Sequence, residues 1–249
     1  MAHQYRKPPI LEASFEARFD TSPNYNVFTP LRVYDELSAD YQSEPVLISD
    51  QGIEIVEDSR EGSDTTFRLK KEQYRYQIAS PDAAWILRFN RRLLSVHASA
   101  PYPGWNAFRE RIHKSLKAYL LVAQPASLQR ISIRYVNQIT FDEEPVDLAD
   151  YFVAPPDTPR DSATSIGAFF QRLECFWPDQ PFRLVQTFAS APDEKLSVIL
   201  DLDMISEENA PLGGLTEDLA MRIDRLREMQ RETFEAVITD KLRGMFNAA

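Results

Sequence analysis

Glycine, cysteine and histidine are all scarce in this 249-residue chain, and each scarcity excludes a class of function. Its 7 glycines form neither G-x-G-x-x-G nor a P-loop, the backbone motifs that close around pyrophosphate. Dinucleotide-binding and ATP-binding folds of those types are therefore excluded. The pattern G-x-S-x-G is also absent, which excludes the commonest signature of α/β-hydrolases but not every serine nucleophile.

The single cysteine, Cys175, cannot form an internal disulfide and predicts a reducing compartment, by default the cytoplasm. Because its neighbours in sequence are hydrophobic, we expect it to pack as an inert side chain. Cys175 and the two internal histidines, His97 and His113, form a zinc site only if they all converge, so we expect no cofactor. His97 and His113 are interpreted as structural or surface histidines, because neither has a neighbouring nucleophile in sequence.

Long hydrophobic runs are also missing. The longest, residues 118–123, is far shorter than the ~20 residues that span a bilayer, and the polar start shows no signal peptide. We therefore expect no membrane partner. What is present, 43% hydrophobic residues including 15 Phe and 10 Tyr, is enough to bury the core of a globular protein.

Acidic residues outnumber basic ones, giving a net charge of −10, which disfavours general attraction to nucleic acid. The basic residues nevertheless concentrate between Arg68 and Lys117, a stretch that contains eleven Lys or Arg residues and only three acidic residues. This stretch either contacts a partner or nucleic acid, or covers solvent-exposed faces of strands and a helix. The candidate contact residues are Arg88, Arg91, Arg92, Arg109, Arg111, Lys114 and Lys117.

Alternating apolar and polar residues predict strands over residues 11–19, 128–141, 182–189 and 195–205. Shorter strand-like runs occupy residues 53–57, 65–71, 74–79, 84–90 and 93–99. The turns between neighbouring runs are too short for crossover helices, so adjacent strands must pair antiparallel. Asn137 interrupts the apolar face of its strand, and if buried it needs hydrogen-bond partners.

Apolar residues at helical spacing predict a helix from Thr29, with Thr29 as N-cap and Pro30 at the first position, and a second helix from Trp105. A short helix is expected over residues 163–174. The longest apolar stripe runs from Leu215 to Met245, with Thr216 able to cap, and predicts about 30 residues of C-terminal helix. The β-branched run 237–239 can interrupt it, with Thr239 capping a last short helix over Asp240 to Phe246.

These elements predict an α+β fold in which antiparallel sheet carries amphipathic helices on one side, with a long C-terminal helix. We divide the chain into an N-terminal α+β region (1–141), an acidic, proline-rich loop or linker (142–162) and a C-terminal helix–hairpin–long helix region (163–249). The two outer regions are expected to pack as one unit.

Asp201 and Asp203 are the candidate metal ligands. They fall on the same side of a strand, about 6–7 Å apart, and paired carboxylates of this kind hold Mg²⁺ or Mn²⁺ in phosphoryl-transfer enzymes. Such enzymes also need a loop that grips phosphate, and none precedes this strand. The alternative interpretation is two acids facing solvent.

Five sequence blocks together are familiar: Pro8–Ala13, Tyr102–Phe108, Arg130–Ile139, Leu200–Asp203 and Phe234–Arg243. They include a Pro-Pro-Ile-x-Glu-Ala start, an Arg-Tyr-x-Asn-x-Ile strand and a Phe-Glu-x-x-Ile-Thr-Asp end. Over nearly its whole length the chain resembles a sporadically distributed, uncharacterised bacterial family. That patchy distribution implies an accessory role such as anti-phage defence, and the resemblance carries over no catalytic residue.

Three functional hypotheses follow. The first is a non-enzymatic protein-binding or assembly subunit that contacts another protein. The second is a divalent-metal-dependent enzyme on nucleotides or nucleic acid, with Asp201 and Asp203 as ligands. The third is nucleic-acid binding by the basic stretch between residues 68 and 117.

Overall fold

Nine antiparallel strands form one continuous sheet in the computed structural model, which describes residues 5–56, 66–142, 146–156, 168–191, 195–212 and 217–247. The strand order is β2-β3-β4-β5-β1-β6-β9-β8-β7. The predicted α+β class is confirmed, and the sheet is larger than the sequence implied. The strands are β1 (Ile10–Phe19), β2 (Val46–Val56), β3 (Thr66–Ala79), β4 (Trp85–Asn90), β5 (Leu93–Ser99), β6 (Ser127–Thr140), β7 (Phe170–Phe176), β8 (Phe182–Ser190) and β9 (Ser197–Pro211).

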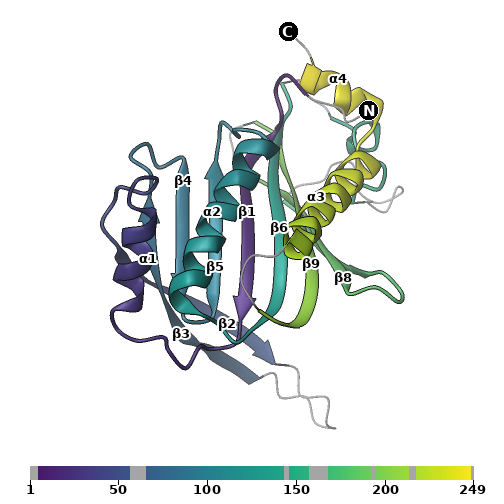
Figure 1. Ribbon diagram of the computed structural model, residues 1–249. Coiled ribbons are helices and arrows are strands. Elements are labelled where there is room, and N and C mark those ends of the chain that lie inside the picture. Colours follow the sequence, from purple (N-terminus) through teal and green to yellow (C-terminus); the bar gives the residue numbers. More distant parts are fainter. Residues whose placement is uncertain are drawn as a thin grey trace.

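The helices α1, α2 and α3 all lie on one face of this sheet (Figure 1). The helical elements are α1 (Thr29–Leu37), α2 (Trp105–Ala123), the 3₁₀ turn η1 (Leu148–Asp150), α3 (Glu217–Val237) and α4 (Asp240–Asn247). The core fills the space between helices and sheet: in β1, Ala13, Phe15 and Ala17 point into it and are fully buried. The intervening polar residues therefore face the opposite side, which we call the helix-free face because α1, α2 and α3 all lie on the other side.

The chain traces a similar path twice. In the first half, β1 is followed by α1 and the meander β2–β5, whose last strand returns to pair with β1, and α2 follows. In the second half, β6 is followed by η1 and the meander β7–β9, whose last strand pairs with β6, and α3 follows. The two first strands, β1 and β6, pair antiparallel in the middle of the sheet. The order of strands and helices is thus similar in the two halves, which meet at the β1–β6 pair.

Most predicted strands are confirmed, and their pairing is antiparallel throughout. From Thr66 onward the runs predicted at 65–71 and 74–79 form one strand, β3, rather than two, and residue 65 lies outside the described residues. Asn137 is buried, and its Nδ2 donates to the Leu200 carbonyl oxygen at 3.0 Å, which meets the predicted need for a partner.

The helix expected over residues 163–174 is wrong where the structure describes it, because Phe170–Phe176 is strand β7. Residues 163–167 lie outside the described part of the chain. The three-residue spacing of Phe170, Leu173 and Phe176 imitates a helical stripe, but pairing with β8 places Leu173 on the opposite side of the strand from the two phenylalanines.

A single C-terminal helix of about 30 residues does not form. The apolar stripe is divided between α3 and α4, with a break at Ile238, which forms a β-bridge with Phe152. The predicted interruption at Thr239 is confirmed: its Oγ1 accepts from the Leu242 amide at 3.4 Å. None of the helices in the described residues is both long and apolar enough to cross a membrane.

Thr29 is not the N-cap of α1, contrary to prediction. Phe28 holds that position, and no side-chain cap forms. The Thr29 hydroxyl instead accepts from the backbone amide of Asn26 at 2.9 Å, which closes the turn that leads into the helix.

Candidate functional site

Asp201 and Asp203 project from β9 onto the helix-free face, as their alternation predicted. Arg134, on the neighbouring strand β6, holds the Asp201 carboxylate with two hydrogen bonds of 2.8 and 2.7 Å. This bidentate pair occupies both oxygens of Asp201. A cation would therefore have to compete with the guanidinium for the same atoms.

Asp203 lies beside this pair in a different environment. Burial raises the pKa of its carboxyl, and the nearby carboxylates of Asp201 and Glu16 add to the rise, while Arg130 and Arg134 oppose it. Its Oδ1 is buried without a hydrogen-bond partner among the described residues. A raised pKa means that the carboxylate form of Asp203 is harder to reach, and Asp203 is therefore a weaker metal ligand.

The surrounding charges form an array of ion pairs. Glu16 lies opposite Ser132 across the β1–β6 pair and reaches diagonally to Arg130. It contacts Arg130 and, within β1, Arg18, each at 2.7 Å. Burial opposes ionisation of Glu16, but Arg18 and Arg130 outweigh it and lower the pKa of this carboxyl. In the described part of the chain no three His, Cys, Asp or Glu side chains are grouped so that they could hold a metal ion.

A second constellation on the same face was not foreseen from the sequence. The His97 ring contacts Glu12 Oε1 through Nδ1 at 2.7 Å and Ser95 Oγ through Nε2 at 3.0 Å. The order hydroxyl, imidazole, carboxylate is that of nucleophilic hydrolases. Ser95, however, is 2% exposed and lies on the inner strand β5, where a substrate carbonyl cannot reach its hydroxyl. We interpret the chain of hydrogen bonds as structural.

Part of this constellation is visible in the sequence. Ser95 and His97 are two residues apart on a predicted strand and must share a face. Glu12 is 85 residues from His97, and only the pairing of β1 with β5 brings them together.

The candidate contact residues from Arg88 to Lys117, all within the described part of the chain, do not gather on one surface. Arg88 lies on the helix-free face of β4, where its Nε donates to Gln77 Oε1 at 2.8 Å. Arg91 and Arg92 are exposed in the turn between β4 and β5, and Arg92 Nε donates to Thr21 Oγ1. The remaining candidates are on α2, across the sheet from Arg88.

Three of the four basic candidates on α2 are paired with acids. Arg109 donates to both oxygens of Asp224 on α3, at 2.6 and 2.8 Å. Arg111 and Lys114 both contact Asp40, and the Arg111 guanidinium also stacks over the Trp85 ring, 4.9 Å from its centroid. Lys117 is exposed. The pairs neutralise most of the charge that a polyanion would meet on this helix.

Strand β7 is the last strand at one end of the sheet, and its apolar side chains are strongly exposed. Phe170 and Phe176 are 72% and 69% exposed on the helix-free face, and Leu173 is 44% exposed on the other. Cys175 is exposed in the same strand, so the expectation that it packs inertly is wrong. Large apolar side chains gathered on a sheet edge are typical of a contact surface.

The hydrogen-bonding direction of β7 follows from its pairing with β8. The Ser190 amide donates to the Phe169 carbonyl and the Trp177 amide to the Phe182 carbonyl, so odd-numbered residues of this segment bond to β8. The even-numbered residues, 170 to 176, therefore direct their amide and carbonyl groups away from the sheet. In the described structure no further strand pairs with them.

No protein-family model matches the chain, and a search of curated proteins finds no significant match.

Proposed function

We propose that this protein is a non-catalytic assembly subunit that joins a second copy of itself by pairing strand β7 with β7 of the other copy. The observation that carries the proposal is an exposed sheet edge whose sequence is complementary to itself. Strand addition at a free sheet edge is a common mode of protein association. It supplies main-chain hydrogen bonds, while the side chains on each face fix the register.

The self-complementarity appears when Phe170–Phe176 is laid antiparallel against itself with Leu173 at the centre. Phe170 then lies opposite Phe176, and Arg172 opposite Glu174. All these residues are even-numbered, so the groups that face outward meet each other in hydrogen-bonded pairs. The twofold axis passes midway between Leu173 of the two copies, so Leu173 lies opposite its own counterpart. A one-residue shift would destroy all of these matches.

The side-chain pairs favour this register energetically. Cross-strand aromatic pairs and opposite charges each contribute about 0.2–1 kcal/mol, and the arrangement makes two of each. Within one chain Arg172 and Glu174 contact each other at 2.6 Å, and Arg183 adds a contact to Glu174 at 3.0 Å. The contact area of a seven-residue strand is small, so we expect a dissociation constant on the order of micromolar.

Charge reversal tests the register directly. Arg172→Glu places Glu opposite Glu174 of the other copy, and Glu174→Arg places Arg opposite Arg172, so each variant alone should remain a monomer of 28.7 kDa. An equimolar mixture of the two variants restores both opposite-charge pairs and should form a heterodimer. Analytical ultracentrifugation over about 1–100 μM, a range that brackets the expected constant, measures all three samples.

The double variant Arg172→Glu/Glu174→Arg should also regain self-association. Arg91→Glu, in an exposed turn far along the sheet from β7, changes the net charge equally and should dimerise like the unmodified chain. If the unmodified chain is monomeric throughout this range, or if both single variants dimerise normally, β7 pairing is wrong. If a stable complex with a different protein is captured from cells and is lost in both variants, β7 pairs with that protein and not with a second copy of this chain.

The other two hypotheses receive less support. Metal-dependent catalysis requires Asp201 to release Arg134, and polyanion binding requires the basic side chains of α2 to release their acidic partners.

A further inference from the structure

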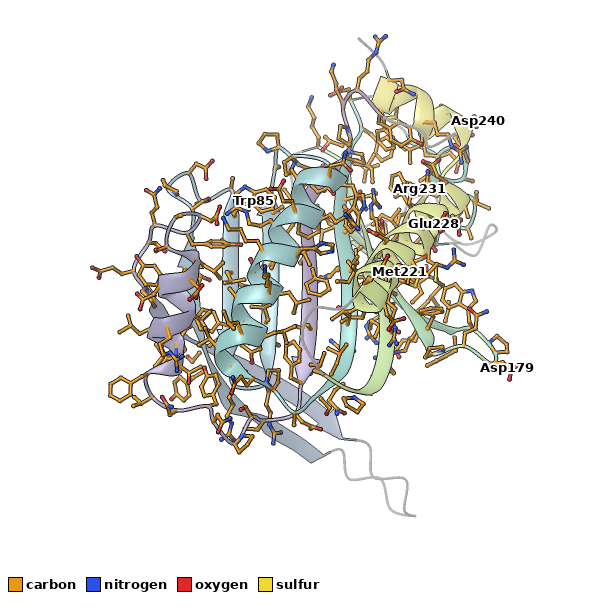
Figure 2. The ribbon with its side chains drawn as sticks, viewed as in Figure 1. Trp85, Asp179, Met221, Glu228, Arg231 and Asp240 are labelled. Atoms are coloured by element: carbon orange, nitrogen blue, oxygen red, sulfur yellow. The ribbon has the colours of Figure 1, made fainter. Side chains whose placement is uncertain are left out.

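A cleft of about 1120 Å³ opens on the helix side of the sheet, away from β7. Its walls come from the N-terminal segment before β1, the first turn of α2, the end of β6 and the length of α3. Figure 2 shows Met221, Glu228 and Arg231 in succession along α3, and all three line the cleft. The volume is sufficient for a small organic ligand.

The acidic side chains of the wall are each paired with a cation. Asp224 is held by Arg109, and Glu228 contacts Arg225 at 2.9 Å. Glu235 contacts Arg243 at 3.0 Å. The acids therefore contribute little uncompensated negative charge to the cleft.

Three arginines of the wall, Arg6, Arg227 and Arg231, have no carboxylate within ion-pair distance in the described residues. Arg227 is the most firmly positioned. Its guanidinium lies 4.3 Å from the centre of the Tyr135 ring and 5.9 Å from that of Trp105, and it donates to Gln230 Oε1. Stacking on an aromatic face leaves the in-plane N–H groups of a guanidinium available, and Gln230 uses one of the five.

The first turn of α2 adds positive potential to the same cleft. Gly104 precedes the helix with a φ of 92°, a backbone conformation that favours glycine, and no side chain caps the helix. The first turn carries no acidic residue. Its free amide groups and the dipole of a 19-residue helix favour an anion near Trp105 and Asn106.

We propose that this cleft binds a small phosphate-bearing anion. Arginines from the N-terminal segment and α3, together with the amide groups of the first turn of α2, surround the space. This arrangement suits a tetrahedral dianion that accepts hydrogen bonds from several directions. A planar carboxylate would be satisfied by one guanidinium. The assignment is independent of pairing through β7, because the cleft and that strand lie on different parts of the fold.

Isothermal titration calorimetry with inorganic phosphate, AMP, ribose 5-phosphate and citrate tests the proposal. We expect at least one phosphate compound to bind with 1:1 stoichiometry and more tightly than citrate. Arg227→Gln and Arg231→Gln should each weaken that binding about 10- to 100-fold, the range for loss of one hydrogen bond to a charged group. Arg109→Gln should weaken it too, because it frees the Asp224 carboxylate in the wall.

Arg91→Gln removes the same charge outside the cleft and should bind like the unmodified chain. Arg231 has no ion pair that its substitution could break within the described structure, so the Arg231→Gln variant separates ligand binding from folding. Absence of binding by all three phosphate compounds at about 10 mM, where even millimolar affinity is measurable, overturns the proposal. So does binding that Arg227→Gln and Arg231→Gln both leave unchanged, or citrate binding as tight as that of the best phosphate compound.

Discussion

Asp203 is an acid placed where its charge is unfavourable. Its carboxyl is largely buried between Arg130 and Arg134, but it makes hydrogen bonds with neither among the described residues, and burial raises its pKa above the ordinary 3.8. A group whose pKa is raised by folding contributes stability below its unfolded pKa and loses that contribution as the pH rises through the folded pKa. At neutral pH the ionised Asp203 therefore destabilises the fold.

The variant Asp203→Asn should raise the free energy of unfolding by about 1 kcal/mol at pH 7, because it removes a buried charge without a partner. The gain should shrink as the pH falls toward 3.8, since the native carboxyl is then protonated. Urea unfolding between pH 4 and 8 measures this. Asp201→Asn is the matched control and should lower stability, because it breaks the bidentate contact with Arg134. An equal loss of unfolding free energy in both variants would show that the charge of Asp203 does not destabilise the fold.

The break between α3 and α4 illustrates how one residue ends a helix. Thr239 Oγ1 donates to the Asp150 carbonyl at 2.6 Å and accepts from the Leu242 amide, so it connects α4 to the segment around η1. Lys241 contacts Asp150 at 2.6 Å and strengthens the same connection. The apolar stripe alone favoured continuation of the helix, and these contacts with a distant segment decided against it.

Replacement of Thr239 by Val keeps the shape of the side chain but removes both of its hydrogen bonds. It should lower the free energy of unfolding by about 1 kcal/mol. Amide hydrogen exchange in α4 should accelerate more than exchange in α3, since α4 depends on this cap. Thr233→Val is the control: its hydroxyl donates back to the Met229 carbonyl within α3, a bond that adds little to helix stability. Faster exchange in both helices to the same degree would argue against a local role.

Alternation in the sequence was sufficient to predict most strands and the face on which Asp201 and Asp203 lie. It could not predict Arg134 as their neighbour, because that requires the pairing of β6 with β9, 67 residues apart. The self-complementary order of Phe170–Phe176 is present in the sequence. Its meaning depends on two facts that local patterns do not contain: the segment is a strand, and its even-numbered residues face outward at a sheet edge.

For the molecule as a whole, the central pairing of β1 with β6 ties the two halves into one sheet. β9, from the region after residue 163, pairs with β6, from the region before residue 141. Fragment 143–249 therefore loses the strand that covers β9 and should not unfold cooperatively when produced alone. Co-expression with fragment 1–142 should restore a soluble complex, judged by circular dichroism and thermal unfolding. A cooperative transition of fragment 143–249 by itself would establish two independent domains.

The two edge strands of the sheet, β2 and β7, differ in sequence and regularity. This difference bears on whether molecules could add to one another edge to edge without limit. β2 exposes Val46 and Leu47 and its register with β3 shifts between Asp50 and Gly52, whereas β7 carries the self-complementary order. If β7 of one molecule added to β2 of the next, each step would leave another free end, and a fibre would result. If β7 pairs with β7 as proposed, both copies of that strand are consumed, so this contact cannot by itself propagate a fibre.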